Sequence, residues 1–213
     1  MELINTLAEK YADTYTSPED ALLKKINEET YATHADAQML SGHVQGRLLE
    51  FISTIMQPRY ILEIGTFTGY SAISLAKGLQ PNGELHTIEL RAEDANICAK
   101  NFSLSESHKK IHLHIGNALD IIPTLPYLWD LVFIDADKPG YITYYEMVIQ
   151  RLNDNGLIIA DNVLFHGQVL EEPVTGKSAL AIDAFNKHVA ADERTEQVML
   201  TVRDGLLFIK KKK

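Results

Sequence analysis

Residues 129–138 read WDLVFIDADK, and residues 157–162 read LIIADN. Each stretch begins with a short apolar run and ends in acidic residues. Apolar runs of this length are typical of strands that are buried on both faces of a parallel sheet. We therefore predict parallel strands over residues 129–134 and 157–160, each followed at its C-terminal end by acidic side chains.

The rest of the chain continues this alternation in both directions. Further strands are predicted at residues 60–64, 84–88 and 111–115, with helices between strands at residues 70–79, 92–102, 118–122 and 141–152. Such spacing indicates βαβ units and a parallel sheet. A helix near residues 178–190 and a hairpin at residues 197–202 and 206–210 follow, and the hairpin puts one antiparallel strand at the edge. The prediction is an α/β fold, doubly wound, with a mostly parallel seven-stranded sheet and an antiparallel edge hairpin.

Length and composition indicate one domain over residues 1–213, with an N-terminal helical arm at about residues 1–38. Within the arm, Ser17 followed by Pro18 predicts a helix start. The net charge of −9 disfavours broad nonspecific binding to nucleic acid. Cys98 is the single cysteine, which fits a reducing, cytoplasmic location. We expect no signal peptide and no membrane span, because no apolar stretch approaches about 18 residues.

The acidic strand ends predict a cation site. Parallel strands bring their C-terminal ends to one edge of the sheet, where open α/β folds bind ligands, so Asp135, Asp161 and Asn162 should converge. Carboxylate and amide oxygens suit Mg²⁺ above all, with Mn²⁺ or Ca²⁺ as alternatives. Lys138, three residues after the first carboxylate, would lie beside that metal. The alternative is that these acids are only helix N-caps.

A glycine turn follows the first parallel strand, where residues 63–71 read EIGTFTGYS. Phe67 occupies the place of the second glycine of a dinucleotide fingerprint, so the turn suits a cofactor without phosphates. Glu63 can accept a hydrogen bond from an ammonium group, and Glu89, which ends the second strand, can accept both hydroxyls of a ribose. S-adenosylmethionine meets these demands. The alternative is an ordinary turn with two solvated acids.

Two other groups of residues have simpler interpretations. His112 and His114 lie two apart on one face of a strand, but no cysteine or third histidine follows at ligand spacing. We interpret them as a solvated or packed face rather than a metal pair. Tyr141, Tyr144 and Tyr145 recur at helical spacing and are interpreted as a packing or subunit face rather than an aromatic substrate clamp.

With these motifs together, the sequence resembles the cation-dependent class I O-methyltransferases, the family that contains catechol and caffeoyl-CoA O-methyltransferases and small bacterial relatives. The resemblance runs from about Met39 to the C-terminus and includes residues 202–206, VRDGL, which look like the family's closing hairpin. It implies a Rossmann-like methyltransferase fold.

The resemblance also implies roles for individual residues. Asp135, Asp161 and Asn162 would be the metal ligands, and Lys138 the general base. Contacts to the cofactor are implied for Ser41, Glu63, Gly65, Thr66, Ser71, Glu89, Asn117, Ala118, Asp135 and Asp137. Met39, His166 and Asp204 are assigned to the acceptor side. His166 stands where plant relatives place an asparagine that contacts the substrate, which argues against the plant phenylpropanoid thioester as acceptor.

The leading prediction is a divalent-metal-dependent transfer of a methyl group from S-adenosylmethionine to a hydroxyl of a catechol-like small molecule. One alternative is methylation of a hydroxylated uridine in transfer RNA, which would need a basic face beside the cleft. A second is a noncatalytic nucleoside-binding module, which would not need the metal acids together with Lys138. No membrane partner is expected. We expect a homodimer, because the apolar arm and the edge hairpin both need cover.

Overall fold

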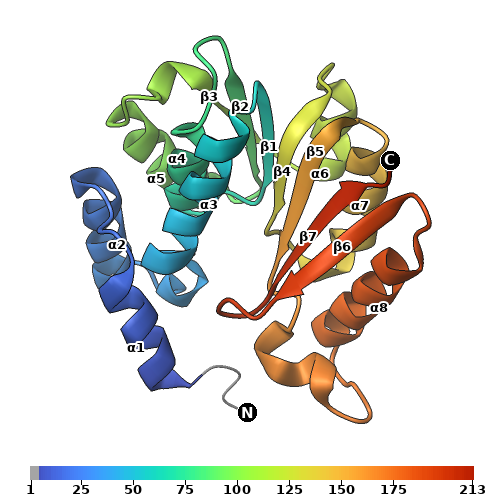
Figure 1. The fold of residues 1–213 in the computed structure, drawn as a ribbon. Helices are drawn as coiled ribbons and strands as arrows, with labels where there is room; N and C mark the ends of the chain where they lie inside the picture. Colours follow the sequence, from blue (N-terminus) through green and yellow to red (C-terminus); the bar gives the residue numbers. More distant parts are fainter. Residues whose placement is uncertain (1–4) are drawn as a thin grey trace.

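A seven-stranded sheet runs through the centre of the molecule (Figure 1), and the computed structural model describes residues 5–213. The strand order is β3-β2-β1-β4-β5-β7-β6. The first five strands of this order are parallel, whereas β7 is antiparallel to both β5 and β6. The strands are β1 (Tyr60–Ile64), β2 (Glu84–Glu89), β3 (Ile111–Ile115), β4 (Trp129–Ile134), β5 (Leu152–Asp161), β6 (Thr195–Leu200) and β7 (Leu206–Lys211). The α/β, mostly parallel fold is therefore confirmed.

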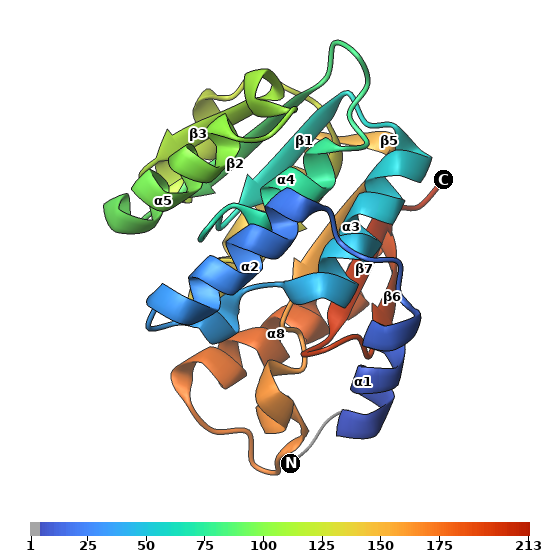
Figure 2. The ribbon, with the colours of Figure 1, turned by 90° about the vertical axis from the view of Figure 1, so that its left-hand side faces the viewer.

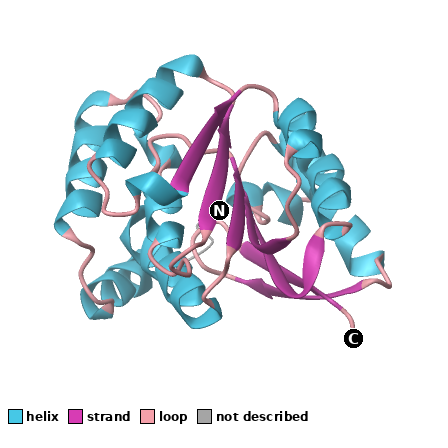
Figure 3. Ribbon diagram, turned by 90° about the horizontal axis from the view of Figure 1, so that it is seen from above, coloured by secondary structure: helices cyan, strands magenta, loops and turns pink. Residues whose placement is uncertain are grey.

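Helices cover both faces of the sheet, which is sandwiched between them when seen from above (Figure 3). They are α1 (Thr6–Tyr15), α2 (Ala21–Thr33), α3 (Gly42–Met56), α4 (Tyr70–Ala76), α5 (Ala92–Ser103), α6 (Ala118–Ile121), α7 (Tyr141–Ile149) and α8 (Lys177–Ala191). Short turns of 3₁₀ helix join them at Ala37–Met39, His108–Lys110, Ile122–Thr124, Lys138–Gly140 and Phe165–Leu170. Figure 2 shows α2, α3 and α4 together on one face, with α8 behind the sheet.

The strands divide the core into two halves because successive side chains point to opposite faces. In β1, Ile61 packs with the helices α2 to α5, whereas Leu62 packs with α7 and α8. Phe133 and Val132 divide in the same way in β4. Continuous apolar strands are thus required by burial on both sides, which is why they could be recognised from the sequence.

Three details differ from the prediction. Helix α2 begins after Asp20, whose Oδ1 accepts a hydrogen bond from the Leu23 N–H at 2.8 Å, and not at Ser17. Ser17 instead uses its carbonyl oxygen to accept from His43 Nε2 at 2.8 Å. The fifth strand begins at Leu152 and not at residue 157, so residues 153–156 belong to β5. The antiparallel strand β7 lies inside the sheet, and β6 forms the edge.

The order of the strands reverses between β1 and β4. From β1 the chain continues to β2 towards one edge of the sheet, and from β4 it continues to β5 towards the other edge. Such a switch point is where open α/β sheets bind ligands. The ends of the two strands are held together there, since the Asp135 N–H donates to the Ile64 carbonyl oxygen at 2.9 Å. Within residues 5–213, no helix has both the length and the apolar character needed to cross a bilayer.

Candidate functional site

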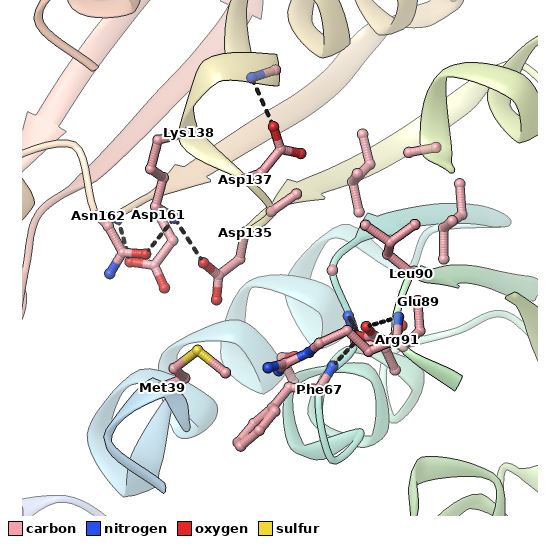
Figure 4. Close-up of a pocket in the computed structure, with 18 of the residues that line it drawn as sticks. Met39, Phe67, Glu89, Leu90, Arg91, Asp135, Asp137, Lys138, Asp161 and Asn162 are labelled. Carbon is pink, nitrogen blue, oxygen red and sulfur yellow. Dashed lines mark hydrogen bonds and ion pairs between the residues drawn. The ribbon is translucent and has the colours of Figure 1, made fainter. Parts of the chain in front are cut away.

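A cavity of about 720 Å³ opens at the carboxyl ends of the parallel strands, and Figure 4 shows it in close-up. Its volume is within the range of small-molecule sites. The residues singled out from the sequence that line it are Met39, Ser41, Gly65, Thr66, Ser71, Glu89, Asn117, Ala118, Asp135, Asp137, Lys138, Asp161, Asn162 and His166. Glu63 and Asp204 are outside this lining. One side of the cavity holds the labelled aspartates, Asn162 and Lys138, and Glu89 and Phe67 lie on the other side (Figure 4).

The glycine turn after β1 forms the floor between these two sides. Gly65 has a φ of +94°, and a Cβ built there would lie 2.0 Å from the Asp135 carbonyl oxygen. Any side chain at this position would therefore collide with the backbone that carries the first acid. The turn needs glycine both for its left-handed conformation and for this close approach.

Glu89 holds the same turn from the side of β2. Its Oε2 accepts hydrogen bonds from the N–H groups of Thr66 at 3.1 Å and Phe67 at 2.8 Å. Its Oε1 accepts from the Arg91 N–H at 2.8 Å. The carboxylate is buried and lines the cavity, so its oxygens lie at the cavity wall while they fix the turn.

Glu63 lies beneath this turn and is fully buried. The Thr87 hydroxyl donates to its Oε2 at 2.5 Å, and its Oε1 has no hydrogen-bond partner within residues 5–213. Burial raises the pKa of Glu63 to about 8, because desolvation, aided by the charges of Asp135 and Glu89, outweighs the nearby hydroxyls of Thr87 and Ser71, which favour the charged form. A buried carboxyl oxygen without a hydrogen-bond partner costs free energy. A donor group that binds to it would recover part of that free energy.

Asp135, Asp161 and Asn162 come together as the sequence predicts. The Lys138 Nζ lies 3.2 Å from Asp135 Oδ1 and 2.7 Å from Asn162 Oδ1, so the lysine nitrogen lies between two of the three side chains. All three offer oxygen atoms, which is the donor chemistry of Mg²⁺, Mn²⁺ and Ca²⁺. The residues present therefore fit a hard divalent cation.

Asp161 is the most buried member of this group. Its Oδ2 accepts from Gln45 Nε2 at 2.6 Å, and its Oδ1 accepts from the Asn162 N–H at 2.7 Å. Burial first, and then the nearby charge of Asp135, raise the pKa of Asp161 to about 7. A bound cation would relieve this repulsion between carboxylates.

Lys138 is not a surface lysine, because its side chain is 13% exposed. Besides the two contacts described above, its Nζ lies 2.7 Å from the Tyr141 hydroxyl. That hydroxyl in turn donates to the Asp161 carbonyl oxygen at 3.1 Å. Tyr141 thus ties the lysine of the turn after β4 to the backbone at the end of β5.

Asp137 has a capping role that Asp135 does not share. Its Oδ2 accepts from the Gly140 N–H at 3.1 Å, and its Oδ1 accepts from the Tyr144 hydroxyl at 2.5 Å. Tyr144 lines the cavity, whereas Tyr141 and Tyr145 pack in the core. The packing interpretation is therefore confirmed for Tyr141 and Tyr145, whereas Tyr144 is buried and also borders the cavity.

Two contacts of the closing hairpin were missed by the sequence analysis. Arg203 Nη1 donates to the Leu40 carbonyl oxygen at 2.8 Å and to the Ser41 carbonyl oxygen. These two hydrogen bonds hold the segment of residues 40–41 at the wall of the cavity. The Asp204 Oδ1 accepts from the His166 N–H at 2.5 Å, so Asp204 supports the loop that carries His166. The motif at residues 202–206 was visible, but contacts between residues 38 to 163 positions apart carry no local signal.

The fold agrees with those of solved methyltransferases. A SAH-bound methyltransferase from Podospora anserina superposes with a TM-score of 0.88 at 26% identity, covering 97% of this chain and 94% of that chain. An O-methyltransferase from Bacillus cereus in complex with SAH superposes with a TM-score of 0.86 at 28% identity, covering 97% and 98%. The molecule therefore has the fold of the Rossmann-like methyltransferases.

Sequence comparison narrows the class further. The catechol O-methyltransferase of Niastella koreensis is 34% identical over 191 residues, which are 85% of this chain and 83% of that protein. Residues 12–212 match the sequence model of the O-methyltransferase family. The chain belongs to the O-methyltransferase family, and it is an O-methyltransferase.

Proposed function

We propose that the protein transfers a methyl group from S-adenosylmethionine to a hydroxyl of a catechol-like small molecule, with the aid of a divalent cation. The observation that carries this proposal is the meeting of Asp135, Asp161 and Asn162 beside Lys138 in one cavity with the glycine turn. The relatives named above, one called a catechol O-methyltransferase and two solved with SAH, support the same choice.

The half of the cavity around the glycine turn would bind the cofactor, which supplies an activated methyl group on its sulfonium. Glu89 would accept the ribose hydroxyls at the end of β2, and Asn117 and Ala118 would border the adenine after β3. The unpaired Glu63 oxygen beneath the turn would receive the ammonium group. Ser41 would close over the site, in the segment that Arg203 holds in place.

The opposite half would hold the acceptor. Asp135, Asp161 and Asn162 would bind a divalent cation, Mg²⁺ first and Mn²⁺ or Ca²⁺ as alternatives, and such a cation orients two neighbouring hydroxyls and makes them more acidic. Met39 and His166 line this part of the cavity and would contact the acceptor ring. Asp204 would act through His166, whose backbone it holds.

Lys138 would take the proton from the reacting hydroxyl. A phenol holds its proton to a pH of about 10, so it is a poor nucleophile at neutral pH without help. Lys138 Nζ lies among the oxygens proposed to bind the cation, which puts it within reach of an acceptor bound there. A positioned base of this kind contributes roughly 10²–10⁴-fold to the rate.

Methylation of transfer RNA would need a basic face beside the cavity, and four basic residues that could have contributed to one do not line it. Arg59 precedes β1, and Lys109 and Lys110 precede β3, so they lie at the opposite edge of the sheet from the cavity. Arg47 is paired with Glu50 at 2.6 Å. A small acceptor is therefore favoured.

Two further properties belong to the proposal. The exposed apolar side chains of Leu7, Tyr11 and Tyr15 on α1 would be covered in a homodimer. A cytoplasmic location is supported by Cys98, a buried free thiol.

A screen with labelled S-adenosylmethionine and Mg²⁺ tests the function directly. Catechol and its derivatives should accept the label, whereas phenols with a single hydroxyl should accept far less. Transfer RNA that bears hydroxyuridine is the competing acceptor, and labelling of it without labelling of any catechol would overturn the proposal.

A further inference from the structure

A cluster of imidazole and carboxylate groups lies on the sheet away from the cavity. Glu84 and His86 come from β2, and His112 and His114 come from β3. The two strands are parallel neighbours in a register that pairs His86 with His112. Since residues two apart on a strand share a face, all four side chains lie on the same face of the sheet.

The geometry of three of these groups is close to that of a metal site. One ligand atom each from Glu84, His86 and His112 lies within 4.8 Å of the others. The Glu84 Oε2 lies 3.2 Å from His86 Nε2 and 3.9 Å from His112 Nε2. Ligand atoms bound to Zn²⁺ at about 2.0–2.2 Å in a tetrahedron lie roughly 3.3–3.6 Å apart. The His86 and His112 rings are stacked, with centroids 4.8 Å apart and 17° between their planes, so the exposed His112 ring would need to turn as well as move inward for its nitrogen to face the cation.

The fourth residue, His114, supplies the contact that orients such a ligand. Its Nε2 lies 3.0 Å from His86 Nδ1. A histidine that binds a metal through one nitrogen almost always donates from the other, which fixes the tautomer of the ring. The His86 ring is further held by Tyr127, whose ring centroid lies 4.4 Å away. His86 is thus buried and fixed, while Glu84 and His112 leave the site open to solvent.

We propose that Glu84, His86 and His112 form a second metal site that binds a borderline divalent cation such as Zn²⁺, with His114 as a positioning residue. Imidazole nitrogens suit Zn²⁺, whereas the all-oxygen group in the cavity suits Mg²⁺. The site is separate from the methyl-transfer chemistry and does not depend on the proposed function. By joining β2 to the edge strand β3, a bound cation would stabilise this edge of the sheet.

Calorimetric titration of the tag-free full-length protein with Zn²⁺, in excess Mg²⁺ to occupy the oxygen site, tests this proposal. Zn²⁺ should bind in a single equivalent and raise the midpoint of thermal unfolding. His112→Asn and Glu84→Gln should each weaken binding by at least about tenfold and remove that thermal shift. Asp161→Asn, which alters only the oxygen site, should leave both results unchanged.

His188→Asn is a matched control, because His188 Nε2 also pairs with a carboxylate, Glu146, at 2.7 Å and its side chain is 38% exposed, against 44% for His112. It should not change Zn²⁺ binding. His114→Phe should weaken binding, and His114→Gln, which keeps an acceptor, should restore part of it. Absence of Zn²⁺ binding, or equal affinity in wild type, His112→Asn and Glu84→Gln, would overturn the proposal and leave a cluster that is only hydrogen-bonded and stacked.

Discussion

Lys138 Nζ lies 2.7 Å from Asn162 Oδ1, although the two residues come from different strand ends and are 24 positions apart. The contact exists because β4 and β5 are parallel neighbours, so the turn after one strand meets the turn after the other. It places the lysine inside the group of oxygens that we propose as a cation site.

Lys138→Met should lower turnover with catechol by about 10²–10⁴-fold if Lys138 is the base. Binding of metal and cofactor should persist, as measured by calorimetry. The loss should shrink for nitrocatechol, whose hydroxyl is already acidic and loses its proton without help. Lys100→Met, at the exposed end of α5, is the control and should keep full activity. An equal loss on both acceptors would make Lys138 a positioning residue.

Glu89→Ala should weaken S-adenosylmethionine strongly. The substitution leaves the N–H groups of Thr66 and Phe67 without their acceptor and removes the proposed ribose contact, at a cost of about 1–3 kcal/mol for each group left unpaired. Calorimetry of the variant measures the effect, with Glu93→Ala on the exposed start of α5 as the matched acid. If affinity changes less than twofold, Glu89 is not the ribose acid.

Glu63→Gln should change how stability depends on pH. The pKa of Glu63 is raised to about 8 in the folded protein, against an ordinary value of 4.5, so the folded state holds this proton more tightly than the unfolded state. Its contribution to stability is present below pH 4.5 and is lost as the pH rises to 8. The free energy of unfolding of Glu63→Gln relative to wild type should therefore increase between these values. Urea titrations at several pH values would measure this difference in the free energy of unfolding. A difference that does not change with pH would contradict the raised pKa of Glu63.

Light scattering should give the mass of a dimer, twice the 23.9 kDa of the chain. Helix α1 buries none of its residues within its own chain, yet it carries Leu7, Tyr11 and Tyr15. Tyr11→Glu should shift the mass towards the monomer if α1 lies at the interface. Leu128→Glu, an exposed position just before β4, should not. A monomer mass for the wild type at micromolar concentration would refute the dimer.

The sheet and the acidic side of the site were predictable because both depend on local patterns. Strands buried on both faces are continuous apolar runs, and the residues that follow them must meet at one edge. Asp135, Asp161, Asn162 and Lys138 could be named for this reason. The start of α2 was mispredicted because Ser17 and Asp20 are both good caps, and tertiary contacts, including the one from His43 to Ser17, decide between them.

Contacts between distant segments could not be predicted. Arg203 reaches the carbonyl oxygens of Leu40 and Ser41 across most of the chain. His86 joins His112 only because β2 and β3 are paired in one register, so a search along a single strand found no third ligand. The sequence indicated that Asp204 belongs near the acceptor, but it could not show that this side chain holds the His166 backbone.

Methyl transfer by this protein should need a divalent cation held by Asp135, Asp161 and Asn162. The most direct test is labelled methyl transfer from S-adenosylmethionine to catechol by metal-free protein, before and after addition of Mg²⁺, with Asp161→Asn in parallel. We predict no transfer by the metal-free protein, saturable recovery with Mg²⁺, and no recovery by Asp161→Asn, although that variant still binds the cofactor. Full activity of the wild type in excess EDTA would contradict the account.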